Sequence, residues 1–314
     1  MNAHTNVEAA PLLAVSSLSK RFGDVNAVRN VSFEIERGKT FGLVGESGSG
    51  KSTVARLVLR LLEPTTGAVH FDGQDIGLLN ASKLRSERQH MQMIFQDPYG
   101  SLNPRMTVEE IIAEPMLVHN LGTVKDRKAT AERLIGEVGL PKSSLSRYPH
   151  EFSGGQRQRI AVARALSTRP TFIVADEPVS ALDVSVQAQV LNLMCDLRDQ
   201  YQTTMLFISH DLRVVQFMCD VIAVMYLGQI VEQGPRQRIY EVPSHPYTRA
   251  LLSSAPGTDR DKRTVLEGEI PSAHNVPKGC AFCTRCPIAE NICRERAPQT
   301  TQVEDGHSVA CHFA

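Results

Sequence analysis

Residues 45–53, Gly-Glu-Ser-Gly-Ser-Gly-Lys-Ser-Thr, constrain the fold more than any other part of this chain. The apolar run at 40–44 before them predicts a buried strand, and the apolar periodicity of 54–62 after them predicts a helix. A strand, a glycine-rich loop and a helix in this order are what a phosphate-binding loop requires. The alternative is a glycine-rich loop that matches by chance, and the flanking strand and helix argue against it.

Each residue type in this loop has a role in binding a nucleotide. Backbone N–H groups of the glycine turns and the positive end of the new helix would face phosphate oxygens. Lys51 would reach the β- and γ-phosphates, and the Ser52 hydroxyl would bind Mg²⁺. The residues predicted to bind ATP are Gly45, Glu46, Ser47, Gly48, Ser49, Gly50, Lys51, Ser52 and Thr53.

Two further apolar runs end in ionisable residues. Residues 171–176 predict a buried strand that ends at Asp176 and is followed by Glu177. Asp176 would hold Mg²⁺, and Glu177 would polarise the water that attacks the γ-phosphate. Two solvated loop acids are the alternative. His210 follows the run at 203–209 and is placed to hydrogen-bond a γ-phosphate.

Three more candidates carry an ordinary structural alternative. Gln96 follows the strand-like run 91–95 and could touch Mg²⁺ or water, although such a glutamine, taken alone, is more often a loop residue. Residues 153–156, Ser-Gly-Gly-Gln, could bind an anion at a helix start, and in isolation a capping turn is the commoner explanation. Phe22 could stack on adenine or belong to the core.

The pattern along the chain predicts an α/β protein with an insertion and an appendage. Residues 1–13 are predicted to be a flexible tail, and residues 14–255 the α/β domain that contains the phosphate-binding loop. Residues 97–168 show helical patterns with no strand signal, so we expect a helical subdomain there. From residue 256 to residue 314 the chain is rich in proline, glycine and charge, which predicts a separate C-terminal module.

Charge and hydropathy exclude several classes of protein. The 34 basic and 34 acidic residues balance, so nothing indicates a nucleic-acid partner. No apolar run approaches the roughly 20 residues of a membrane helix. We therefore expect a cytoplasmic protein whose membrane contact goes through a partner.

Five of the seven cysteines lie close to the carboxyl end of the chain. In a cytoplasmic protein such a group argues for metal binding rather than for disulfides. These cysteines are Cys280, Cys283, Cys286, Cys293 and Cys311.

Together these motifs resemble the ATPases of ABC transporters over nearly all of residues 15–255. Residues 95–104, Phe-Gln-Asp-Pro-Tyr-Gly-Ser-Leu-Asn-Pro, and 245–248, His-Pro-Tyr-Thr, resemble the oligopeptide/dipeptide importer branch, which also handles nickel chelates and glutathione. The resemblance implies a P-loop NTPase fold of the ABC type. Such a fold has a RecA-like core, an antiparallel β subdomain and an inserted helical subdomain.

The resemblance also implies the site roles. Two ATPase subunits face each other head to tail, and each ATP lies between the phosphate loop of one subunit and the signature segment of the other. Phe22 takes the adenine-stacking position, and Glu177, His210 and Gln96 are catalytic, while Ser52, Gln96 and Asp176 bind Mg²⁺. The signature segment is Ser153, Gly154, Gly155 and Gln156, and the D-loop is Ser180, Ala181, Leu182 and Asp183.

The implied function is ATP hydrolysis that powers uptake of peptides or related small solutes. The implied partners are a second ABC ATPase subunit (identical or a paralogue), two transmembrane permease subunits and an extracytoplasmic substrate-binding protein. The chain would lie peripherally at the cytoplasmic face of the inner membrane. A soluble ABC ATPase outside transport, an importer for nickel or glutathione, and a metal-sensing regulator are the alternatives.

For the C-terminal module, the resemblance implies a [4Fe–4S] cluster on Cys280, Cys286, Cys293 and Cys311. Four thiolates also suit zinc, and a module without metal is the third possibility. Cys283 is extra relative to the family pattern and would permit a different ligand set.

Overall fold

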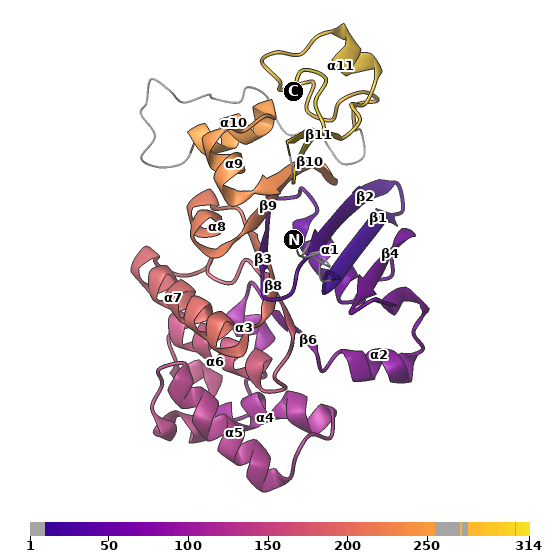
Figure 1. Cartoon of the computed structure of the whole chain (residues 1–314). Helices are drawn as coiled ribbons and strands as arrows, with labels where there is room; N and C mark the ends of the chain where they lie inside the picture. Colours follow the sequence, from indigo (N-terminus) through magenta and orange to yellow (C-terminus); the bar gives the residue numbers. More distant parts are fainter. Residues whose placement is uncertain (1–9, 255–270, 272–275, 305) are drawn as a thin grey trace, which may run out of the picture.

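In the computed structural model, two β-sheets lie between a group of helices at one end and a cysteine-rich segment at the other (Figure 1). The structure describes residues 10–254, 271, 276–304 and 306–314. Most of the predicted tail, residues 1–9, lies outside them, whereas Leu12 and Leu13 are buried against the first sheet.

The larger sheet has eight strands in the order β11-β12-β10-β9-β3-β8-β7-β6. Five of them run parallel to one another: β9 (Val221–Tyr226), β3 (Thr40–Val44), β8 (Thr204–Ser209), β7 (Phe172–Asp176) and β6 (Met91–Ile94). All residues of β3, β7 and β8 are buried, which explains their continuous apolar runs. Parallel strands deliver whatever follows them to one edge of the sheet.

The strand register fixes which residues meet at that edge. Val44 of β3 pairs with Ser209 of β8, and Ile208 of β8 pairs with Asp176 of β7. Ala175 of β7 pairs in turn with Ile94 of β6. The segments that follow these four strands therefore lie side by side although they are far apart in the sequence.

The second sheet is antiparallel, with strand order β2-β1-β4-β5. Its strands are β1 (Leu13–Phe22), β2 (Val25–Ile35), β4 (Thr66–Phe71) and β5 (Gln74–Asp75). Its apolar face shares one buried cluster with α1 (Lys51–Val58) and β3, which includes the stacked rings of Phe33 and Phe41. The 3-10 turn η1 (Ile76–Leu78) and α2 (Ala81–Glu87) connect this sheet to β6.

Residues 97–168 contain helices and turns only, and they form the group at the bottom of Figure 1. Thr107 and Thr123 start two of the helices with capping boxes, which satisfy the first free backbone N–H groups. The elements are α3 (Pro98–Ser101), α4 (Val108–Val118), α5 (Val124–Glu137), η2 (Lys142–Ser146), η3 (Pro149–Glu151) and α6 (Gly154–Leu166).

The remaining helices of the described residues all follow β7 in the chain. The helices are α7 (Val184–Tyr201), α8 (Leu212–Met218), α9 (Arg236–Glu241), α10 (Pro246–Ser253) and α11 (Asn291–Glu295). Among the described residues, no helix is both long enough and apolar enough to cross a bilayer.

The C-terminal residues continue the large sheet. β12 (His307–Val309) pairs with β10 (Gln229–Pro235) and with β11 (Thr301–Glu304). Phe282 is fully buried against the rings of Tyr226 and Tyr247, each at a centroid distance of 5.3 Å. Residues 255–270, 272–275 and 305 of the predicted module lie outside the described residues, and the described part packs into the core of the ATPase domain.

Candidate active site

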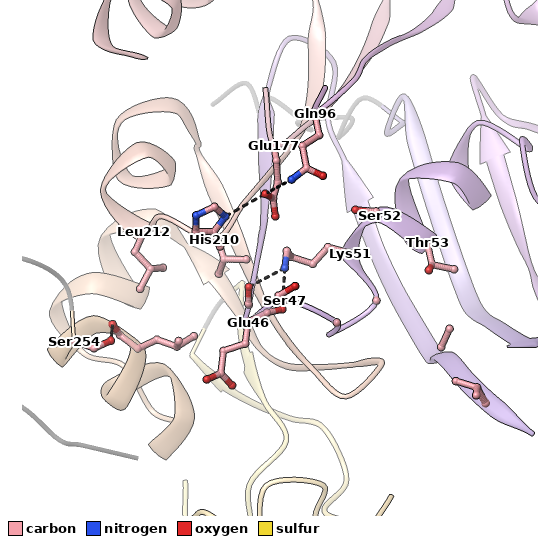
Figure 2. Close-up of a pocket in the computed structure, with 17 residues that line it drawn as sticks. Glu46, Ser47, Lys51, Ser52, Thr53, Gln96, Glu177, His210, Leu212 and Ser254 are labelled. Atoms are coloured by element: carbon pink, nitrogen blue, oxygen red, sulfur yellow. Dashed lines mark hydrogen bonds and ion pairs between the residues drawn. The ribbon is translucent and has the colours of Figure 1, made fainter. Parts of the chain in front are cut away.

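A pocket of about 720 Å³ opens at the carboxyl edge of the parallel strands (Figure 2). Its wall brings together the phosphate loop and the segments after β6, β7 and β8. Eleven of the predicted site residues line it: Gly45, Glu46, Ser47, Gly48, Gly50, Lys51, Ser52, Thr53, Gln96, Glu177 and His210. Ser49 is buried beneath the loop.

The phosphate loop has a conformation that its glycines permit. Gly50 has φ +103°, in the left-handed region, and a Cβ there would lie 2.3 Å from the carbonyl oxygen of Ala27. Only glycine fits such a position, because any side chain would meet backbone. The loop delivers its last residues to the start of α1, where unpaired backbone N–H groups face the pocket.

Lys51 places a cation inside this loop. Its side chain is buried, and Nζ donates hydrogen bonds to the carbonyl oxygens of Gly45 at 2.8 Å and Glu46 at 2.9 Å. Burial lowers the pKa of Lys51, while Glu177, Asp176 and Glu46 act to raise it. The ammonium group is therefore held among carboxylates and carbonyls, where it can exchange its carbonyl partners for phosphate oxygens.

Ser52 and Asp176 form a pair of oxygen ligands next to Lys51. Ser52 Oγ donates to Asp176 Oδ1 at 3.0 Å. Burial raises the pKa of Asp176, and the hydrogen bond from Ser52 acts to lower it. Hydroxyl and carboxylate oxygens are ligands that suit Mg²⁺, so this pair fits the predicted ion.

Glu177 is held from two sides. Gln96 Nε2 donates to Glu177 Oε2 at 3.0 Å, and His210 Nδ1 lies 3.1 Å from the same oxygen. Figure 2 shows these three side chains converging above Lys51. Glu177 also has φ +46°, a backbone conformation that a non-glycine residue adopts at a cost of about 1–3 kcal/mol. The surrounding strands therefore fix this carboxylate in a strained position at the pocket wall.

The predicted signature segment lies away from this pocket. Ser153 caps α6, since its Oγ accepts from Gln156 N at 3.4 Å and its N donates to Gln156 Oε1 at 3.0 Å. Ser153 and Gln156 are exposed, and the residues that line the described pocket include none of the four. Gly155 is buried, and a Cβ there would lie 2.3 Å from Val186 Cγ1.

The predicted D-loop, residues 180–183, lies between Glu177 at the pocket and the signature segment at the start of α6. The backbone N and the Oγ of Ser180 both donate to the carbonyl oxygen of Glu177, at 3.2 and 3.0 Å. Leu182 lies against the start of α6. A Cβ atom added to Gly154 would be 3.3 Å from Leu182 Cδ2. Ala181 and Asp183 are exposed, and Asp183 is the N-cap residue of α7. The turn therefore links the residue beside the pocket to the signature helix.

Phe22 stands at the end of β1 with 45% of its surface exposed, and Lys20 Nζ lies 5.1 Å from its ring centroid. The residues that line the described pocket do not include it. Its adenine-stacking role stays a prediction. The pocket wall also contains residues that sequence reasoning missed: Val25, Ala27, Val44, Leu212, Leu251 and Ser254. Leu212 follows His210 by two positions, whereas Leu251 and Ser254 carry no signal in the sequence.

The five C-terminal cysteines are all free thiols in the structure. Cys280 N donates to the carbonyl oxygen of Cys293 at 2.8 Å, and burial, together with the nearby thiols of Cys293, Cys283 and Cys286, raises the pKa of Cys280 to about 11. Within the described residues, however, no group of three or more His, Cys, Asp or Glu side chains is arranged to hold a metal ion. The structure thus gives no support to the predicted iron–sulfur cluster.

Two family models match this chain, one in its N-terminal half and one nearer its carboxyl end. Residues 28–180 match the family model described as ABC transporter, and residues 231–293 match the model described as oligopeptide/dipeptide transporter, C-terminal region. The chain is 53% identical to the oligopeptide transport ATP-binding protein AppF of Bacillus subtilis, over 94% of this chain and 91% of that protein. It is also 53% identical to a putative peptide import ATP-binding protein of Brucella ovis, over 96% and 97% of the two chains.

The fold of this chain is also similar to that of a solved ATP-binding cassette. The dimeric, post-hydrolysis structure of the ATP-binding cassette MJ0796 bound to ADP and Pi superimposes with a TM-score of 0.65 at 28% identity. The match covers 71% of this chain and 98% of that one.

Proposed function

The chain belongs to the ABC transporter family, and on that premise we propose that it is the ATP-hydrolysing subunit of a peptide importer. Relatives that cover almost the whole chain at 53% identity are named for peptide import and oligopeptide transport. These matches confirm the family and the ATPase activity that the motifs predicted. They do not favour a soluble ATPase outside transport or an importer for nickel or glutathione.

The position of the Glu177 carboxylate is the observation that carries the hydrolytic assignment. Gln96 and His210 hold one of its oxygens beside Lys51, and this is where a general base for the attacking water has to stand. Lys51 and the backbone N–H groups at the start of α1 would hold the β- and γ-phosphates. Ser52, Asp176 and Gln96 would hold Mg²⁺, which neutralises phosphate charge when it is bound.

We propose that a second ATPase subunit completes each site. Ser153 and Gln156 present the N-terminus of α6 to the outside of the chain's own pocket. An exposed helix N-terminus with two glycines is suited to phosphate, and a partner arranged head to tail would supply it. A cassette of this family has been solved as a dimer with ADP and Pi, which supports the same arrangement here.

An ABC importer ATPase works with permease subunits, and a groove beside Gln96 is suited to receive one. The groove measures about 310 Å³, and its lining includes the half-exposed Leu61, Phe95 and Val118 next to Arg164. It lies between the end of β6 and α4, where the importer-type residues 95–104 begin. We propose two permeases, an extracytoplasmic substrate-binding protein, and a peripheral position on the cytoplasmic face of the inner membrane.

The [4Fe–4S] cluster on Cys280, Cys286, Cys293 and Cys311 stays a proposal, with zinc as the alternative. Iron and zinc content of anaerobically purified protein, together with the visible absorption spectrum, separates the two. A colourless protein with stoichiometric zinc would reverse the assignment. A protein that contains neither metal would remove it.

Glu177→Gln tests the proposed function, with the ATPase reconstituted alongside its permeases. We expect hydrolysis to fall by about a hundredfold or more, because the general base is lost. ATP binding should persist, and the subunits should accumulate as an ATP-bound dimer detectable by size-exclusion chromatography. Glu63→Gln is the matched control, since Glu63 is a largely exposed surface residue outside the pocket. Normal turnover in the Glu177 variant would overturn the assignment.

A further inference from the structure

The C-terminal segment reaches the phosphate loop through a partly buried ion pair. Arg285 Nη1 lies 2.8 Å from Glu46 Oε2, and Arg285 Nη2 lies 3.2 Å from Glu46 Oε1, so the contact is bidentate. The Arg285 side chain is 6% exposed and that of Glu46 27% exposed. The two residues are 239 positions apart in the chain. A bidentate pair at this burial holds both groups in one geometry.

Aromatic residues surround this pair and fix it further. The backbone N of Glu46 donates to the hydroxyl oxygen of Tyr247 at 3.0 Å, and the Tyr247 hydroxyl lies 3.3 Å from Glu46 Oε2. The guanidinium carbon of Arg285 lies 6.0 Å from the centroid of the Tyr226 ring. Phe282, three residues before Arg285, packs on both tyrosines. The C-terminal segment, the α10 helix and the loop therefore meet at Glu46.

Glu46 poses an electrostatic problem for the reaction. It lines the pocket that receives the triphosphate, and its carbonyl oxygen is one of the two that accept from Lys51. A carboxylate beside polyphosphate repels it, more strongly in a partly buried site than in water. In Figure 2 the Glu46 side chain points away from Lys51. The Glu46 carboxylate forms its ion pair with Arg285. The arginine both neutralises this charge and keeps the carboxylate turned away from Lys51.

We propose that Arg285 is a positioning residue for ATP binding, which acts through Glu46 to hold the phosphate loop in its anion-binding state. This inference rests on the proposed function, because it assigns a further determinant of the same nucleotide site. On this proposal, the C-terminal segment contributes to ATP binding through Arg285. Loss of the arginine would leave the Glu46 carboxylate uncompensated beside the phosphates.

A charge-removal series on the full chain tests this proposal, with the affinity for a fluorescent ATP analogue in the presence of Mg²⁺ as the readout. We expect Arg285→Gln to weaken binding by about tenfold, because one charge of a partly buried pair remains unpaired. Arg285→Lys should lose less, since the charge stays while the bidentate geometry is lost. The double variant Glu46→Gln/Arg285→Gln should recover most of the affinity.

The rescue separates positioning from a general structural effect, because a damaged C-terminal segment would not be repaired by a second substitution in the loop. Arg238→Gln is the matched control: Arg238 and Glu304 form an ion pair at 2.6 Å between α9 and β11, and neither residue lines the pocket. Equal affinity of Arg285→Gln and the unaltered chain, or a double variant as weak as Arg285→Gln, would overturn the proposal. If the unaltered chain itself fails to bind the analogue, the proposed ATPase function fails instead.

Discussion

The nucleotide pocket and the cysteine-rich end of this chain both collect reactive side chains, but they do so by different means. In the pocket, Lys51, Gln96, Glu177 and His210 follow parallel strands whose register brings them together. In the cysteine-rich end, the thiols lie on a turn, on irregular segments and on the five-residue helix α11. The backbone builds the first site before any ligand arrives, whereas a thiolate site depends on its metal for its geometry.

The two regions are nonetheless physically joined. The β11–β12 hairpin extends the large sheet, and His307 Nε2 lies 2.8 Å from the buried Glu232 Oε1 of β10. Glu232 also accepts from the backbone N of Ser244 at 2.6 Å and of His245 at 2.9 Å. The cysteine-rich end is therefore anchored by the fold itself.

The largest effect is expected inside the pocket. Lys51→Ala should lower hydrolysis by about a thousandfold, because it removes the buried cation that faces developing phosphate charge. Turnover of the reconstituted transporter measures this loss. Lys39→Ala is the control, since Lys39 is exposed in the turn before β3. If the Lys51 variant retained normal turnover, this pocket would not be the site of ATP hydrolysis.

The junction should make stability depend on pH through His245. Burial lowers the pKa of His245 to about 4 from an ordinary value of 6.5, with Arg249 contributing in the same direction. The imidazole is neutral in the folded chain, where its Nδ1 accepts from Tyr247 N at 3.0 Å. Between pH 6.5 and pH 4 the unfolded chain binds the extra proton, so the free energy of unfolding should fall by about 3 kcal/mol across this window.

Denaturant unfolding at a series of pH values measures this slope. His245→Asn is the informative variant, because its side-chain oxygen can still cap α10 while it does not titrate. We expect the contribution of His245 to the slope to disappear in this variant. An unchanged slope would show that other groups carry the dependence.

The smallest effect is expected at the signature segment, outside the chain's own pocket. Gly155→Ala places a Cβ against Val186 and shifts the start of α6. We expect hydrolysis by the assembled transporter to fall by about tenfold while ATP affinity of the isolated chain stays within about twofold. Equal losses in both measurements would place this segment inside the chain's own site.

The sequence predicted the site residues best where a motif directly follows a buried strand. The glycine pattern of residues 45–53 and the apolar strands before Glu177 and His210 predicted residues that do meet at one pocket. The family was predicted from the same motifs and is confirmed. The contact of Arg285 with Glu46 could not be predicted, because no periodicity or spacing links residues 239 positions apart. The same holds for Leu251 and Ser254, which reach the pocket only through the packing of α10.

For the cysteines, in contrast, the sequence pattern does not determine how the side chains are arranged. Their grouping near the carboxyl end predicted metal binding, and the family resemblance implied a [4Fe–4S] cluster, yet the described residues contain no group arranged to hold a metal ion. Spacing reports which thiols are near each other along the chain, but a ligand set also needs side-chain orientation. That orientation is not encoded by turns of this kind without a metal to impose it.

The central claim is that this chain supplies half of each ATP site and a second subunit supplies the rest. The specific ATPase activity of the purified chain, at dilutions where light scattering shows a monomer, tests it most directly. We expect such a monomer to bind ATP and to turn it over at about a hundredth of the rate of the assembled transporter or less. Full turnover by a monomer would contradict it.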